Sequence, residues 1–131
     1  VAASVRAVVA QRLVRRLCPH CKVPDPARID PRWLGALSLP QDVADRVERS
    51  ARMTHAPSGC ARCDGSGYDG RIAVYEHLDV TPAVARCLRA SAGEPALRAA
   101  AEGEGFRGFV GVAFERLFEG DTSLHELMRA V

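Results

Sequence analysis

The chain of 131 residues lacks most features that would point directly to a catalytic or membrane function. Aromatic residues make up only 5% of it, and Lys22 is the only lysine among 18 Lys and Arg residues. No run approaches the roughly 20 apolar residues of a membrane span, and no signal peptide opens the chain. The phosphate-binding pattern GxxxxGK[ST], a Ser-His-Asp grouping and a recognisable pair of catalytic carboxylates are also missing. The sequence therefore predicts no transmembrane segment and no catalytic or nucleotide-binding residues.

The composition is that of a globular protein. Apolar residues account for 47% and charged residues for 26%, both ordinary values for a soluble domain. The net charge of +2 is too small to imply a nucleic-acid partner. Five cysteines without an export signal favour a reducing compartment, and metal binding over disulfides. Since the chain opens on Val1 and enters a helix-like pattern at once, we interpret it as a piece of a longer polypeptide.

Four of the cysteines form two pairs with the same spacing, Cys18 with Cys21 and Cys60 with Cys63. A gap of two residues lets both sulfurs of a pair face one tetrahedral metal ion. Closing the long intervening loop is not prohibitive, because each doubling of loop length costs only about 0.6 kcal/mol. Structural zinc supplies roughly 10–16 kcal/mol. We therefore predict a zinc ion with these four cysteines as its ligands.

Two other interpretations of the cysteines stay open. Cys18-Pro19-His20-Cys21 is also the redox pair of some thioredoxin-like oxidoreductases, where a helix N-terminus lowers the thiol pKa. Here the pair follows a predicted helix and precedes a proline-rich segment. The run from Cys60 to Gly67 looks like one zinc repeat of the J-domain co-chaperones, which carry four. A thiol–disulfide oxidoreductase and a stand-alone zinc module that binds protein or nucleic acid are thus the alternatives.

The remaining candidate ligands have weaker patterns. His20 could replace a cysteine, but with four cysteines present we expect it to be exposed or beside the ligands. The other histidines show no metal spacing and are expected to be ordinary: His55, His77 and His125. Cys87 is predicted to be a buried free thiol on an apolar helix face. The arginines at 6, 12, 15 and 16 are expected on a solvated helix face.

Hydrophobic periodicity predicts a helix-rich α+β fold in three parts. Residues 1–17 are expected to form a helix, 18–78 a zinc element with a small strand pair and a returning strand at 71–78, and 79–131 a C-terminal helical bundle. Helices are expected near 31–37, 41–49, 94–102 and 108–118, after the cap Thr81 with Val84, Cys87 and Leu88, and from Ser123, where Glu126 completes a capping box. Because the helices after Thr81 have their own caps and apolar faces, we expect them to depend on metal less than the loop does.

Several strings of residues together resemble one family, the ATPases of type II secretion and type IV pilus assembly. Ala10–Arg15 followed by Leu17–Lys22 is similar to the family's AQRLVR..LCP.CK, and Gly59–Cys63 with Gly67–Arg71 to its GC..C...GY.GR. Val74–Glu76 resembles the strand that comes next, and Gly120–Leu124 with Glu126 resembles the closing G.TS..E. The resemblance spans residues 1–131 and identifies the C-terminal end of such proteins.

The resemblance implies a cytoplasmic, homo-hexameric motor whose RecA-like core hydrolyses ATP with Mg²⁺ and carries a tetracysteine zinc element. The motor's phosphate loop would lie upstream of Val1, so this chain would be the zinc-binding fragment, with a structural and interaction role and no activity alone. Implied partners are neighbouring motor subunits and secretion or pilus platform proteins at the inner membrane, with no nucleic acid. One departure is Val112-Ala113, where the family usually has Asp-Gly, which puts a polar contact there in doubt.

Overall fold

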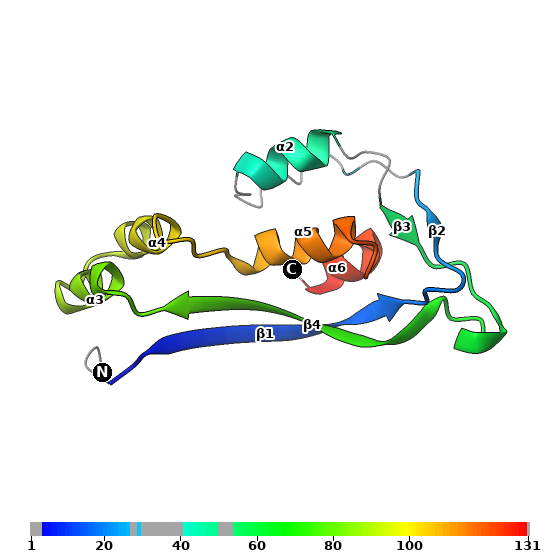
Figure 1. Cartoon of the computed structure of the whole chain (residues 1–131), viewed down its shortest axis with the longest axis horizontal. Coiled ribbons are helices and arrows are strands. Elements are labelled where there is room, and N and C mark those ends of the chain that lie inside the picture. Colours follow the sequence, from blue (N-terminus) through cyan, green and yellow to red (C-terminus); the bar gives the residue numbers. More distant parts are fainter. Residues whose placement is uncertain (1–3, 27–28, 30–40, 50–53, 131) are drawn as a thin grey trace. The chain divides into compact units, whose positions relative to one another are not determined.

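The computed structural model describes residues 4–26, 29, 41–49 and 54–130, which adopt an α+β fold (Figure 1). The elements in chain order are β1 (Ala7–Leu17), β2 (Val23–Pro24), α2 (Gln41–Arg49), β3 (His55–Ala56), the 3-10 helix η1 (Ala61–Cys63), β4 (Tyr68–Asp79), α3 (Pro82–Arg89), α4 (Glu94–Glu102), α5 (Phe109–Phe118) and α6 (Leu124–Ala130). The predicted fold class, helix-rich α+β with small strand pairs and a four-cysteine element, is confirmed. None of these helices combines the length and apolar character needed to cross a membrane.

The helix predicted over residues 1–17 is wrong, because residues 7–17 form strand β1. Val9, Leu13 and Leu17 recur every four residues, a spacing that fits one face of a helix and equally one face of a strand. The valines favour extended backbone, and pairing with β4 decides the outcome. Within the strand only Val14 and Leu17 are buried, whereas its first seven residues are exposed.

Two small sheets organise the strands. β1 and β4 pair and run in opposite directions (Figure 1). Backbone hydrogen bonds flank both ends of this ribbon, from Cys18 N to Gly67 O and from Val80 N to Arg6 O. The returning strand predicted at 71–78 is thus confirmed within a longer β4. The second sheet pairs β2 with β3 antiparallel, with Pro24 opposite His55.

The described helices begin and end close to the predicted positions. α2 coincides with the predicted span, and its Val43 and Val47 are buried. Thr81 caps α3 by accepting a hydrogen bond from Val84 N at 3.3 Å. Ser123 Oγ likewise accepts one from Glu126 N at 3.2 Å, before α6. The helix predicted near 31–37 lies outside the described residues.

The chain divides into two compact units, grouped differently from the predicted boundaries after residues 17 and 78. Residues 1–11 and 75–109 form what we call the helical unit, with α3 and α4. Residues 12–74 and 110–131 form the cysteine unit, with both cysteine pairs, α5 and α6. The largest fully buried side chains of the cysteine unit include Phe114, Leu17, Leu117 and Leu127. Ala113 of α5 is also buried and Val112 half-buried, so apolar residues fit this position, where the resemblance implied Asp-Gly.

Two leucines four residues apart on β1 provide a test of this packing. Leu17 is 2% exposed and Leu13 is 60% exposed. Leu17→Ala is expected to lower the free energy of unfolding by about 2–5 kcal/mol, because it leaves a cavity in the core. Leu13→Ala is expected to change it by no more than about 0.5 kcal/mol. Urea unfolding followed by circular dichroism measures both; equal losses would mean that Leu13 is buried as deeply as Leu17, which would contradict this packing.

Candidate metal centre

The four paired cysteines come together in one group. Their Sγ atoms all lie within 4.8 Å of one another. The Sγ atoms of Cys18 and Cys60 are 3.9 Å apart. Those of Cys21 and Cys63 are 3.8 Å apart, and those of Cys60 and Cys63 are 3.7 Å apart. A tetrahedral ion with metal–sulfur bonds of about 2.3 Å requires sulfurs about 3.8 Å apart. The arrangement therefore fits a single tetrahedral ion, and the group could hold a metal.

The first pair sits on a turn at the end of β1. Cys18 is completely buried, and its backbone N–H donates to Gly67 O at 2.9 Å, beside the start of β4. Its carbonyl accepts from Cys21 N at 3.3 Å and from Lys22 N at 3.0 Å. These bonds curl the chain so that both sulfurs face the same side. The strand pairing thus places the first pair next to the second.

The second pair lies at the two ends of η1, with Cys60 as its N-cap and Cys63 as its last residue, and a tight turn follows at residues 64–67. Cys60 O accepts from Cys63 N at 3.2 Å and from Gly65 N at 2.9 Å, which brings its side chain over that of Cys63. The turn needs glycine at two places. At Gly59 (φ +98°) a Cβ would lie 2.5 Å from Gly65 O, and at Gly67 (φ +75°) it would overlap Pro57.

The thiols differ in how readily they ionise. Desolvation opposes ionisation of Cys63, but the backbone N–H groups of Cys60 and Gly67 donate to its sulfur at 3.3 and 3.2 Å and lower its pKa to about 6. Desolvation, followed by hydrogen bonds with the neighbouring thiols, raises the pKa of Cys21 to about 12. One thiolate thus forms readily, while a fully ionised group requires a cation to balance its charge.

The other predicted candidates lie beside or away from this group. His20 is exposed, as expected, and its Nε2 lies 2.7 Å from Nη1 of Arg62, which joins the two cysteine turns from outside. His77 and His125 are exposed on β4 and α6. Cys87 is half-buried rather than buried, and its thiol faces Ala96 O of α4 at 3.9 Å.

The backbone after the first pair weakens the redox interpretation. Cys18 comes at the end of a strand, not of a helix as predicted, so the preceding element alone does not argue against a redox pair. A turn and β2 come next, so within residues 17–26 no helix begins whose N-terminus could stabilise the Cys18 thiolate. Its sulfur instead belongs to a group of four.

Sequence reasoning missed how the α5–α6 turn docks beside the cysteine pairs. The Nζ of Lys22 donates to Gly120 O at 2.8 Å, at the C-terminal end of α5 where a cation is favoured. Leu17 N donates to Asp121 O at 2.8 Å, and Thr122 Oγ1 donates to Arg15 O at 2.9 Å. Three consecutive residues of the turn therefore bind the segment 15–22 that carries the first pair.

Arg15 completes this docking and departs from the solvated position expected for it. Its guanidinium pairs with the buried carboxylate of Glu126 and lies 4.0 Å from the ring centre of Tyr68. The Tyr68 hydroxyl is 2.8 Å from Ser123 Oγ. The only signal of this docking in the sequence was the string Gly120–Leu124 with Glu126, whose contacts the sequence did not reveal.

Gly120 is required by the same docking. It has φ +71°, and a Cβ there would lie 2.8 Å from Nδ1 of His55 and 3.0 Å from Nζ of Lys22. The Nδ1 atom of His55 is buried and, among the described residues, has no hydrogen-bond partner. A side chain at residue 120 would therefore have to displace the His55 ring or the Lys22 amine and would adopt a strained positive φ.

Comparison with known proteins assigns the chain to a family. The model of the type II/IV secretion system protein family matches residues 1–129. The chain belongs to this family. The resemblance predicted from the cysteine strings and the Gly120–Leu124 string is thereby confirmed.

Curated relatives of this secretion-family chain are much longer than it is. It is 33% identical to the type IV pilus assembly ATPase TfpB of Acinetobacter baylyi over 99% of the chain and 21% of that protein. It is 32% identical to the type II secretion system ATPase E of Vibrio cholerae over 98% of the chain and 24% of that protein. A putative type II secretion system protein E of Escherichia coli is 31% identical over 96% and 24%. The chain thus spans about a fifth to a quarter of the relatives' length.

Two glycines of the second turn provide a matched test of the metal centre. Gly59→Ala and Gly65→Ala both place a side chain at positive φ, at roughly 1–2 kcal/mol each, but only Gly59 lacks space for it. We expect Gly59→Ala to weaken metal binding by at least about tenfold, with a much smaller effect of Gly65→Ala. Titration with Co²⁺, followed by its visible absorbance, measures the affinity. Equal weakening would mean that backbone conformation alone, not the contact with Gly65 O, makes glycine necessary.

Proposed function

We propose that this chain is the zinc-binding region of a larger ATPase that powers type II protein secretion or type IV pilus assembly. The observation that carries the proposal is the group of four sulfurs at tetrahedral spacing in a chain of this family. Cys18, Cys21, Cys60 and Cys63 would hold the ion as thiolates. Four thiolate ligands leave no open coordination position for a substrate, so the ion's role would be structural.

The residues around the sulfurs support a structural role. When bound, zinc supplies the positive charge that lets all four thiols ionise, including Cys21 with its raised pKa. The backbone N–H groups that already donate to Cys63 then stabilise a thiolate ligand. Fixing Cys21 also fixes Lys22, whose amine binds the end of α5. The metal would thus hold the start of the loop, the start of β4 and the α5–α6 turn in one arrangement.

We further propose the assembly in which this region works. The parent would be a cytoplasmic homo-hexamer, peripheral at the inner membrane through secretion or pilus platform proteins. ATP and Mg²⁺ would bind to other parts of the parent. The longer relatives named as ATPases support this assignment over a stand-alone zinc module, and the four-sulfur group supports it over a thiol–disulfide oxidoreductase.

Zinc binding, and the set of segments that zinc stabilises, can be tested together. Elemental mass spectrometry of the purified chain is expected to give about one zinc per chain. In Cys60→Ser, hydrogen exchange should become fast in residues 16–26, 54–67 and 110–130, because α5 and α6 dock on the segment 15–22. α3 and α4 belong to the helical unit and should keep their protection. For α5 and α6, this outcome would correct the expectation that the helices after Thr81 depend on metal less than the loop does.

Cys87→Ser provides the control for that experiment. It makes the same chemical change at a free thiol outside the group and should leave zinc content and the exchange of residues 110–130 unchanged. A folded, zinc-free chain with ordinary protection would show that the four thiols have no metal to hold. Loss of protection in Cys60→Ser that extends equally over α3 and α4 would contradict the division into two units.

Catalysis provides a separate test of the assignment to part of a motor. Since no phosphate-binding loop occurs in residues 1–131, the chain alone should release no phosphate from ATP above the buffer rate. A steady-state phosphate-release assay with Mg²⁺ measures this. Turnover that persists through further purification and disappears on substitution of a residue of this chain would refute the proposal that ATP is hydrolysed by other parts of the parent protein.

A further inference from the structure

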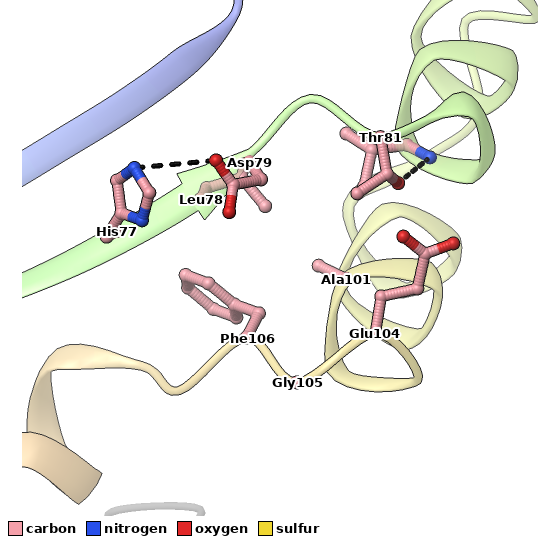
Figure 2. Close-up of a pocket in the computed structure, with 9 residues that line it drawn as sticks. His77, Leu78, Asp79, Thr81, Ala101, Glu104, Gly105 and Phe106 are labelled. Atoms are coloured by element: carbon pink, nitrogen blue, oxygen red, sulfur yellow. Dashed lines mark hydrogen bonds and ion pairs between the residues drawn. The ribbon is translucent and has the colours of Figure 1, made fainter.

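The helical unit contains a cavity to which neither the metal centre nor the proposed function assigns a role. It measures about 160 Å³ and lies between the end of β4, the start of α3 and the turn after α4 (Figure 2). Its lining includes Leu78, Asp79, Val84, Ala101, Glu104 and Phe106. All these residues lie within residues 75–109 of the helical unit, so the cavity shares no residue with the metal centre.

Backbone hydrogen bonds fix the turn that forms one wall of the cavity. Phe106 N donates to Ala101 O at 3.0 Å and Gly105 N donates to Glu102 O at 3.0 Å, with Gly105 at φ +93°. This pattern is a Schellman motif, which ends a helix in one defined conformation. Figure 2 shows that the motif directs the side chains of Glu104 and Phe106 toward the end of β4 and Thr81. The wall is therefore preorganised.

The charge of the cavity is negative. The carboxylates of Asp79 and Glu104 line it, and no lysine or arginine does. The Nε2 atom of His77 lies 3.5 Å from Oδ1 of Asp79, and the His77 side chain is exposed. Among the residues that the structure describes, the Glu104 carboxylate has neither a hydrogen-bond nor an ion-pair partner. The cavity therefore complements a cation that brings hydrogen-bond donors to Glu104.

The remainder of the lining is apolar. Val84 is completely buried and Ala101 is 4% exposed, and together they form a floor without hydrogen-bonding side chains. The ring of Phe106 faces the same space (Figure 2). An apolar floor, an aromatic ring and a carboxylate together suit a cation on an apolar stem, whose methylenes cover the floor while its charge meets the ring and the carboxylate.

The volume of the cavity limits which chemical group can occupy it. Sites for small organic ligands measure roughly 300–1,000 Å³, so this cavity is suited to a single side chain. A guanidinium stacks on an aromatic ring and binds a carboxylate with two parallel hydrogen bonds, which an ammonium cannot do. We propose that the cavity is a docking site for an arginine side chain that a protein partner presents.

The experiment is an NMR titration of the ¹⁵N-labelled chain with arginine blocked at both ends (N-acetyl-arginine methylamide). Saturable shifts are expected at the amides of Leu78, Thr81 and Phe106. Blocked citrulline, which has the shape of arginine without its charge, should leave these amides unshifted, and blocked lysine should bind more weakly than arginine. Equal shifts with citrulline, or the same shifts with MgCl₂ alone, would overturn the proposal.

Matched variants connect the binding to the cavity. Glu104→Gln removes the unpartnered charge and should weaken arginine binding by about fivefold or more. Phe106→Leu should abolish the preference for arginine over lysine. Glu102→Gln changes an exposed carboxylate of α4 outside the cavity and should bind as the unaltered chain does. In each variant, amides far from the cavity that keep the chemical shifts of the unaltered chain show that the variant is folded. Full affinity in Glu104→Gln, or equal loss in Glu102→Gln, would refute the assignment.

Discussion

The main constraint on the cysteine unit is that four sulfur atoms from two distant parts of the chain lie within 4.8 Å of one another. Cys18 and Cys60 are 42 residues apart in sequence, and beside the sulfurs the Cys18 N–Gly67 O hydrogen bond and the His20–Arg62 contact join their turns. Around these turns a glycine is required at 59 and 67, because any side chain would overlap the neighbouring backbone or Pro57. Once the two turns meet, the ends of β1 and β4 are adjacent, and Lys22 is in position to reach α5.

Local chemistry explains which parts of the fold could be predicted. The spacing within each cysteine pair and the caps at Thr81 and Ser123 depend on residues a few positions apart. β1 could not be assigned by the same means, because Val9, Leu13 and Leu17 satisfy both a helical and a strand period. Its conformation depends on a partner strand some fifty residues later, which periodicity does not reveal.

The docking of α5 and α6 could not be predicted from the sequence either. Lys22, Arg15 and Thr122 are common polar residues, and no spacing marks which of them will bind across the chain. Sequence patterns suggested that all helices after Thr81 form one subdomain. The structure instead places α5 and α6 with the cysteines, and α3 and α4 in the other unit. The family string Gly120–Ser123 thus has a physical reason, since each of its residues contacts the segment beside the cysteines or its partner strand.

The exposed first half of β1 has a consequence for handling the protein. Val8 is 52% exposed and Val9 is 58% exposed, on opposite faces of the strand, and no third strand pairs with the β1–β4 ribbon in the described part of the chain. An exposed apolar segment on a strand edge that no further strand covers is a template on which other chains add strands. In concentrated solution the isolated chain should therefore self-associate along this edge. A charged residue in place of Val9 would be a rational first change for keeping it monodisperse.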